Sequence, residues 1–136
     1  MNPFPPKSAE TEVWEVIQAF NRAFAANDPD IYFSFVDEDV IVITPSNPYR
    51  VEGIADDREG FEHGLREGYG CVGYFQAMQP HVAVFGEAAV VTYFSRGSYG
   101  TEGKTKTAYL KETDILVKKD ETWKIVHVHV SSTVGG

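Results

Sequence analysis

Two acidic residues, Glu112 and Asp114, stand two positions apart in a stretch where apolar and polar residues alternate. Residues i and i+2 of a β-strand point to the same face, so this spacing predicts that the two carboxyl groups lie side by side. Leu110 and Leu116 would share that face, and apolar neighbours raise a carboxyl pKa toward the range of a useful general base. Asp114 is therefore the candidate catalytic residue. The alternative is that Asp114 pairs with a cation such as Arg96 and only holds the strands together.

A second pair with possible chemistry is His127 and His129, near the end of the chain. A His-x-His pair on a strand could supply half of a metal site. Strand parity places Trp123 and Ile125 on the same face as the two histidines, and no third ligand stands at a telling spacing. We therefore predict no metal and no cofactor, and we expect the histidines to pack or to form hydrogen bonds at a subunit interface.

The first half of the chain predicts three helices. Ser8 suits an N-cap, and apolar residues then recur every three or four positions until about Asn27. Asp28 and Pro29 form a cap and first-turn pair for a short second helix. The third helix, over about 57–67, contains two glycines and is predicted to be weak.

Strands make up the rest of the prediction. The β-branched run that starts at Val40 and is stopped by Pro45 predicts one strand between the second and third helices. After it, the alternation predicts strands at about 72–78, 81–85, 88–99, 104–118 and 123–132. Tight turns between them, to which the glycines Gly97, Gly100 and Gly103 are assigned, make neighbours antiparallel. We expect an α+β fold: a cone-shaped, strongly curved antiparallel sheet whose concave face is closed by the three helices.

Length and composition limit the remaining choices. The chain has 136 residues, which predicts a single domain over 8–136 after a Pro-rich tail at 1–7. A net charge of −8 argues against nucleic acid and acidic membranes as partners. The single cysteine, Cys71, excludes an intrachain disulfide, and no apolar stretch has the length of a signal peptide or a membrane span. These features predict a cytoplasmic protein.

Two stretches carry a resemblance to a known family. The segments QPHVAVFGE (79–87) and KETDILVKKDETWKIVHVHVSS (111–132) resemble the association, or hub, domain of calcium/calmodulin-dependent protein kinase II. Three shorter matches lie upstream: ND at 27–28, Tyr32 with Asp37, and VEG at 51–53. That domain belongs to the nuclear transport factor 2-like superfamily, whose stand-alone bacterial members are called SnoaL-like. The resemblance implies the cone-shaped fold and self-association through the sheet, as a homodimer or a higher oligomer.

The resemblance also suggests which face lines a pocket. The pocket-facing arginines of the hub family correspond to Ser95, Asp114 and Val130 here, and Tyr32 matches a tyrosine that lines the hub pocket. The chain departs from the family here, because the cations are missing and an acid is present, and this departure predicts a neutral or cationic ligand in place of the family's anionic ligands. The predicted pocket residues are Tyr32, Tyr93, Ser95, Glu112, Asp114 and Val130, and parity adds Val91, Leu110, Leu116, Val126 and Val128.

Three functions remain open from the sequence, because this fold hosts many activities. The first is a stand-alone oligomerising module with a conical pocket for a small, partly apolar ligand and no established catalysis. The second is a SnoaL-like isomerase, cyclase or hydratase that uses Asp114 with Tyr32 or Tyr93 on a hydrophobic substrate. The third is a purely structural assembly domain, whose pocket would be filled by side chains.

Overall fold

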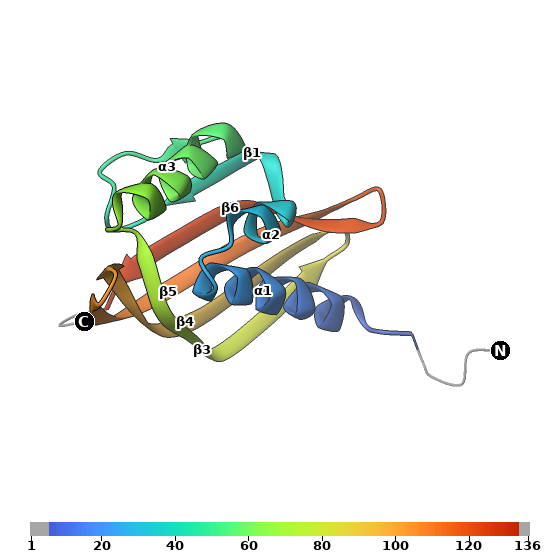
Figure 1. Ribbon diagram of the computed structural model, residues 1–136. Helices are drawn as coiled ribbons and strands as arrows, with labels where there is room; N and C mark the ends of the chain where they lie inside the picture. The colour runs from blue at the N-terminus through green and yellow to red at the C-terminus, as the bar shows by residue number, and fades with distance from the viewer. Residues whose placement is uncertain (1–5, 134–136) are drawn as a thin grey trace.

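The computed structural model describes residues 6–133, so most of the predicted N-terminal tail (residues 1–5) and residues 134–136 of the predicted domain lie outside the described part. Three helices and six strands follow one another along the chain (Figure 1). They are α1 (Ala9–Ala25), α2 (Pro29–Ser34), β1 (Val36–Ile43), β2 (Val51–Glu52), α3 (Ile54–Glu67), β3 (Cys71–Phe85), β4 (Ala88–Thr101), β5 (Lys104–Lys119) and β6 (Thr122–Ser132).

The two predicted helix caps are confirmed. The Ser8 hydroxyl accepts a hydrogen bond from the backbone N–H of Thr11 at 3.2 Å, and the Asp28 carboxylate accepts one from that of Ile31 at 3.2 Å. These bonds satisfy donors that the first helical turn leaves unpaired. The third helix begins at Ile54, which is earlier than predicted.

Asn27 fixes the end of α1 against the sheet. This residue adopts a left-handed backbone conformation (φ 56°), which asparagine tolerates better than most side chains. Its side chain then forms two hydrogen bonds with the backbone of Val72 in β3, at 2.8 and 3.0 Å. The C-terminal half of α1 is therefore held at a defined place along β3.

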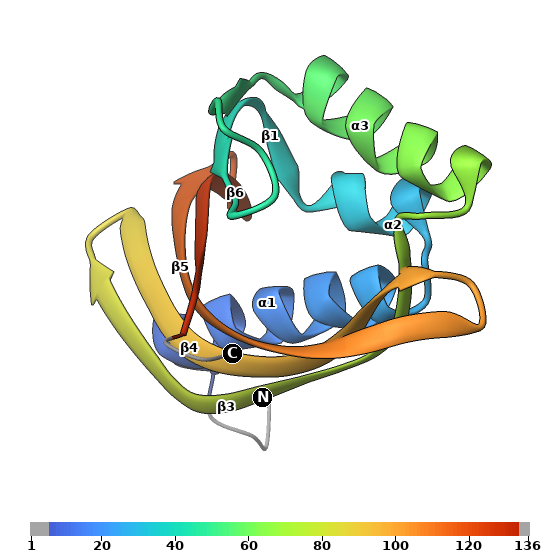
Figure 2. The ribbon, with the colours of Figure 1, turned by 90° about the vertical axis from the view of Figure 1, so that its left-hand side faces the viewer.

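The strands form one sheet in the order β2-β1-β6-β5-β4-β3. Consecutive strands from β3 to β6 are antiparallel, as predicted, whereas β1 pairs in parallel with β6, which the sequence did not indicate. The predicted strands at 72–78 and 81–85 are one strand, β3, with an irregularity between Met78 and His81 where Gln79 has a φ of 53°. Figure 2 shows the sheet curving around α1, with the helices on its inner face and the outer face left bare.

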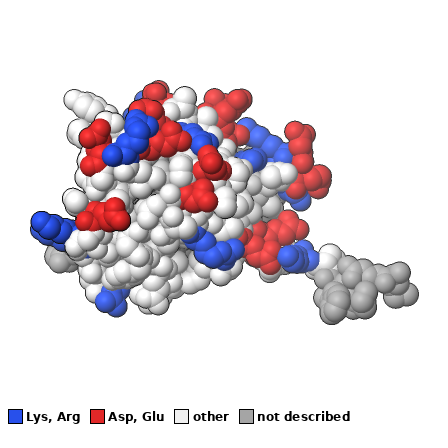
Figure 3. Space-filling view, viewed as in Figure 1, with Lys and Arg blue, Asp and Glu red and all other residues white. Residues whose placement is uncertain are grey.

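The surface of the described residues carries mixed charges. Figure 3 shows lysine, arginine and acidic side chains gathered over α3 and the β5–β6 turn. Among residues 6–133, no helix is both long and apolar enough to cross a membrane.

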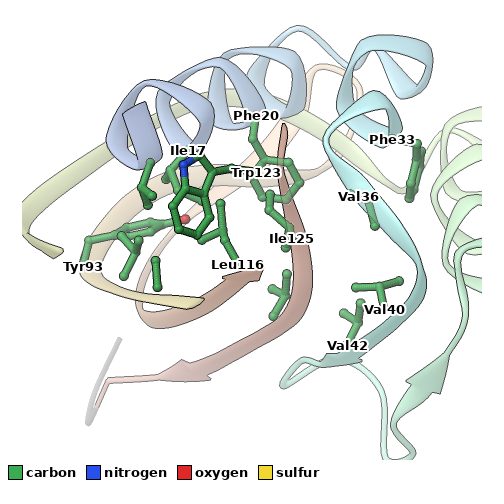
Figure 4. Close-up of a cluster of buried hydrophobic side chains, with 14 residues drawn as sticks. Ile17, Phe20, Phe33, Val36, Val40, Val42, Tyr93, Leu116, Trp123 and Ile125 are labelled. Atoms are coloured by element: carbon green, nitrogen blue, oxygen red, sulfur yellow. The ribbon is translucent and has the colours of Figure 1, made fainter. Parts of the chain in front are cut away.

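The core lies between α1 and the inner face of the sheet (Figure 4). Ile17 of α1, Leu116 of β5 and Ile125 of β6 have no exposed surface at all. Each side chain of this size contributes about 1.5–3 kcal/mol when it is fully buried. This packing holds α1 over the middle of the sheet, which determines where the polar residues described below can lie.

A bulge in β6 corrects one prediction. Ile115 of β5 lies opposite His127, but the next residue, Leu116, lies opposite Ile125, so Val126 is an extra residue in β6. A one-residue insertion reverses the facing of the residues that precede it. Trp123 and Ile125 are therefore buried in the core, and the prediction that they share the outward face of the histidines was wrong.

Candidate functional site

Strand register gathers five of the predicted pocket residues on the inner face. Tyr93 of β4 lies opposite Glu112 of β5, which in turn lies opposite Val130 of β6. Asp114 stands two residues beyond Glu112, and Ser95 stands two residues beyond Tyr93. Because alternate residues share a face, these side chains project to the same side of three adjacent strands.

The Tyr93 hydroxyl is the centre of a buried hydrogen-bonded group. Its oxygen lies 2.5 Å from Glu112 Oε2, 2.9 Å from Asp114 Oδ2 and 3.3 Å from Asn21 Oδ1. A tyrosine hydroxyl has one proton and can donate only one hydrogen bond, so it cannot satisfy both carboxylates. A proton held on one carboxyl group supplies the missing donor. The four residues thus form a proton-sharing group, which we call the acid cluster.

The acid cluster lies away from every neutralising cation among the described residues. Asp114 has no exposed surface and Glu112 is 9% exposed, and no lysine or arginine within residues 6–133 forms an ion pair with either. Arg96, the cation considered in the sequence-based alternative, lies on the outer face with its guanidinium carbon 5.9 Å from the Tyr74 ring centre. The alternative in which Asp114 pairs with Arg96 is therefore wrong.

Burial determines how these groups titrate. It raises the pKa of Asp114 well above its ordinary value, and the neighbouring Glu112 charge raises that pKa further. Burial also raises the pKa of Glu112, while the hydrogen bonds it receives oppose the shift. Burial raises the pKa of Tyr93 as well, and the charges of both acids add to this effect. We therefore place the retained proton on Asp114.

Within the described residues, four buried polar atoms have no hydrogen-bond partner, and they lie together. They are Asn21 Nδ2, Ser95 Oγ, the Tyr99 hydroxyl and Asp114 Oδ1. The Ser95 hydroxyl nevertheless lies close enough to that of Tyr99 to lower the pKa of Tyr99. Two of these residues belong to the acid cluster, and Ser95 and Tyr99 stand on the β4 face that also carries Tyr93. Buried polar groups in folded proteins are normally paired. These atoms and the acid cluster together make up the candidate functional site.

Sequence analysis missed Tyr99, and it also missed why position 97 requires a glycine. Both residues share the inner face of β4 with Ser95, since they stand at alternate positions. A Cβ atom on Gly97 would overlap the hydroxyl and ring of Tyr99, so only glycine lets this ring lie back along the strand. Burial raises the pKa of Tyr99 to about 12, which keeps its hydroxyl protonated. The sequence-based assignment of Gly97 to a turn is wrong, because Gly97 lies within β4.

Tyr32 lies on the inner side of the molecule without joining the acid cluster. Its ring stacks on Phe20 with centres 4.2 Å apart and contacts Phe61 of α3 at 5.0 Å. Burial raises its pKa, and the charges of Asp57, Glu112 and Asp114 reinforce the shift. The structure gives no hydrogen bond between Tyr32 and the acids.

Asp57 in α3 is a second residue that sequence reasoning missed. Its carboxyl group is half-buried and forms no ion pair within residues 6–133, and burial raises its pKa to about 6. The signal was available, because Asp57 precedes Phe61 by four positions and so shares the apolar face of the helix. It adds a third carboxyl group whose charge reaches Tyr32.

The inner face is closed at one end and reaches solvent at the other. Along β5, burial falls from Asp114 through Glu112 to Leu110, which is only half-buried. Along β6, Val130 is half-buried and Ser132 is exposed. The open end is bordered by the half-buried rings of Phe24, Tyr32, Phe61, Phe75 and Tyr99. A ligand entering there would meet aromatic rings first and the acid cluster last.

A separate groove of about 260 Å³ runs along the seam between α1 and β3. It is lined by Trp14, Gln18, Asn21, Arg22, Ala25, Phe75 and Ala77, and none of the six predicted pocket residues lines it. Asn21 belongs to both this groove and the acid cluster, and the Trp14 ring centre lies 6.1 Å from that of Tyr93. The groove therefore borders the acid cluster from the helix side.

The two histidines of β6 lie on the outer side of the sheet. Their ring centres are 6.5 Å apart, and the described residues contain no group of three or more histidine, cysteine or acidic side chains that could hold a metal ion. His127 lies opposite Ile41, and His129 lies opposite Ile43, on the neighbouring strand β1. They are part of an uncovered surface that includes apolar side chains.

Comparison with known proteins identifies the relatives of this arrangement. A family model of the calcium/calmodulin dependent protein kinase II association domain matches residues 9–134. The solved Chlamydamonas reinhardtii kinase hub homology domain is 27% identical, with a TM-score of 0.76 over 93% of this chain and 99% of that one. The kinase hub of S. rosetta is 25% identical, with a TM-score of 0.75 over 95% of this chain and 100% of that one.

A third structure extends the likeness in fold. A putative ketosteroid isomerase from Parabacteroides distasonis is 22% identical, with a TM-score of 0.77 over 97% of this chain and 93% of that one. Other similar structures are described as nuclear transport factor 2-like proteins, which confirms the predicted cone-shaped fold. No curated protein matches the chain.

Proposed function

Because the chain belongs to the calcium/calmodulin dependent protein kinase II association domain family, we propose that it is a self-associating module that binds a small, partly apolar ligand on the inner face of its sheet. We also propose that the protein is cytoplasmic. Its single cysteine, Cys71, is a free thiol, and free thiols are typical of proteins in the reducing cytoplasm.

Ligand binding is supported by the unpaired polar atoms beside the acid cluster. Ser95 Oγ, the Tyr99 hydroxyl and Asp114 Oδ1 are buried without partners among the described residues, on a face that opens to solvent through aromatic rings. Leaving a buried polar group unpaired costs about 1–3 kcal/mol. A purely structural domain would gain stability by replacing these groups with apolar ones, so this feature argues against the assembly-only alternative.

Self-association is supported by the uncovered outer face of the sheet. Phe94 and Tyr109 expose 43% and 44% of their surface there, and the helices all lie on the opposite side (Figure 2). Large exposed apolar patches mark interaction sites in soluble proteins. Two of the similar structures are kinase hubs, or hub homologues, and we propose that this chain associates through the same kind of surface.

Native mass spectrometry of freshly purified protein tests both parts of the proposal. We expect an integer multiple of 15.1 kDa together with a small additional mass, and denaturation would release the compound for identification. The Phe94→Lys variant should shift the mass to a smaller assembly, because a charge in an apolar interface is costly. Ile31→Lys is the control, since Ile31 is 52% exposed on α2, which lies on the opposite side of the sheet (Figure 2). A wild-type monomer without bound mass would contradict the proposal.

Catalysis is the second candidate, and the proton-sharing acid cluster favours it. An acid pair that shares one proton can accept a proton from a substrate carbon on the ionised carboxylate of Glu112 and return a proton to another position from the protonated Asp114, as an isomerase requires. Under this alternative, Asp114→Asn abolishes turnover of a hydrophobic substrate while the fold and the assembly mass persist. Loss of assembly together with turnover would make Asp114 a structural residue.

A further inference from the structure

We infer that the ligand of the inner face is a protonated amine with an apolar body, whose ammonium group lies among Ser95, Tyr99 and the acid cluster. The inference deepens the proposed function and rests on it, because it names the chemical class that the proposed site accepts.

The first support is uncompensated negative charge. Glu112 and Asp114 are buried together, and Asp57 adds a third carboxyl group from α3. No ion pair of the described lysines and arginines involves any of the three. A buried charge without a partner is costly, and an ammonium ion bound beside it would remove that cost.

The second support is the set of unpaired acceptors. Asp114 Oδ1, Ser95 Oγ and the Tyr99 hydroxyl oxygen are buried and can each accept a hydrogen bond. Asp114 Oδ1 has no partner within residues 6–133, and the Ser95 and Tyr99 hydroxyls lie close enough together for Ser95 to lower the pKa of Tyr99. Ser95 is 1% exposed, so water competes poorly there. A primary ammonium group has three N–H donors and no acceptor. The number and the kind of these atoms therefore match a protonated primary amine.

The third support is the aromatic surround. The Phe24 ring lies 5.7 Å from Phe75, 6.1 Å from Tyr99 and 6.4 Å from Phe61, measured between ring centres. Aromatic faces attract cations electrostatically and also bind apolar groups. The open end thus suits the apolar body of the ligand, while the deeper acids suit its charge.

Proton linkage gives the inference a signature of its own. Tyr93 of β4 and Asn21 of α1 contact the acid pair, and the charge of Glu112 also acts on Tyr99 of β4 and Tyr32 of α2. Asp57 of α3 acts on Tyr32 as well. None of them is a cation. A bound ammonium would stabilise the ionised carboxylates, so binding should release a proton, and affinity should increase as the pH rises.

Calorimetric titration of the whole protein with three probes of one shape provides the test. The probes are 2-phenylethylamine, 2-phenylethanol and phenylacetate, which carry a cationic, a neutral and an anionic end. We expect the amine to bind at least about tenfold more tightly than the alcohol, because charge-assisted hydrogen bonds are stronger than neutral ones. Phenylacetate should not bind. Titrations in buffers of different ionisation enthalpy should show proton release with the amine alone.

The outcomes separate this inference from the proposed function. Equal affinity for the amine and the alcohol would leave the ligand site intact but overturn the cationic class. Tighter binding of phenylacetate would overturn it in the same way. If none of the three probes binds, both the ligand-binding part of the proposed function and the amine inference are contradicted.

Variants of the acid cluster and of Ser95 test whether the amine binds at this site. Glu112→Gln keeps the shape but removes the charge, so amine affinity should fall at least about tenfold while affinity for 2-phenylethanol is unchanged. Glu87→Gln, at the exposed β3–β4 turn, is the charge-matched control and should change neither affinity. Ser95→Ala supplies a second variant should Glu112→Gln fail to fold, and it should weaken the amine about three- to tenfold. Unchanged amine affinity in both variants would overturn the inference.

Discussion

The Tyr93 hydroxyl oxygen and Glu112 Oε2 lie 2.5 Å apart across the β4–β5 pair, where both side chains are buried. Asp114 Oδ2 approaches the same hydroxyl at 2.9 Å, so one phenol proton lies between two acids. This contact ties neighbouring strands together, and it determines which protons the folded protein retains. The predictions about the acid cluster follow from it.

Removing the Tyr93 hydroxyl should destabilise the protein. Tyr93→Phe leaves two buried carboxyl groups without their shared donor, which costs about 1–3 kcal/mol. The free energy of unfolding in urea measures this loss. Tyr109→Phe is the control, because Tyr109 is 44% exposed on the outer face and its hydroxyl has no comparable role. Equal stability of the two variants would mean that the short contact contributes nothing to the fold.

The proton on Asp114 should make stability depend on pH in a definite direction. Its pKa is raised by burial, so the folded state keeps a proton that the unfolded state releases above about pH 4. The free energy of unfolding therefore falls as the pH rises from that point. Asp114→Asn carries no titrating proton and should remove this part of the slope. Its stability relative to the wild type should improve steadily between pH 4 and pH 8, as measured by urea unfolding at each pH.

The contrary result would be equally informative. If wild type and Asp114→Asn show parallel curves over that range, Asp114 does not carry the retained proton. Glu112→Gln then becomes the informative comparison, because Glu112 is the other acid whose pKa burial raises.

The sequence predicted the shared face of three residues of the acid cluster, because strand parity holds wherever a strand is regular. Glu112, Asp114 and Tyr93 lie in regular parts of β4 and β5, and they share the inner face as predicted. The facing predicted for Trp123 and Ile125 in β6 was wrong, because the extra residue Val126 reverses the facing of the residues before it. Nothing in the order of alternating residues distinguishes such a bulge from a regular strand.

The parts of the site that sequence missed depend on contacts between distant segments. Asn21 lies on α1 and reaches Tyr93 only because Asn27 holds the end of that helix against β3. Asp57 is half-buried because α3 packs against β1 and α2. The parallel pairing of β1 with β6 likewise joins the two ends of the chain, and no local pattern encodes it.

Asp57 provides a second test of how burial of a carboxyl group makes stability depend on pH. Its pKa rises from 3.8 to about 6, so the folded state holds this proton between those values and stability declines as the pH increases through them. Asp57→Asn should therefore be more stable than the wild type by about 1–3 kcal/mol at pH 7, with little advantage near pH 4. Thermal unfolding at several pH values measures this difference. Asp56→Asn, an exposed neighbour in the same helical turn, should show no such dependence. Identical profiles for both variants would show that burial does not control Asp57.

Gly97 and Tyr99 test whether the open end of the inner face is built as described. A Cβ on Gly97 would overlap the Tyr99 hydroxyl and ring, so Gly97→Ala should displace that ring and cost about 1–3 kcal/mol of unfolding free energy. The same substitution in a Tyr99→Ala background meets no ring, so its cost should largely disappear. A double-mutant cycle in urea therefore gives a coupling energy of at least about 1 kcal/mol. Gly60→Ala, at a helical position where a Cβ meets nothing within 4 Å, should be neutral or stabilising in both backgrounds. Additive costs for Gly97 and Tyr99 would show that the ring does not lie against the strand, and the acceptor that Tyr99 supplies to the amine site would be lost with it.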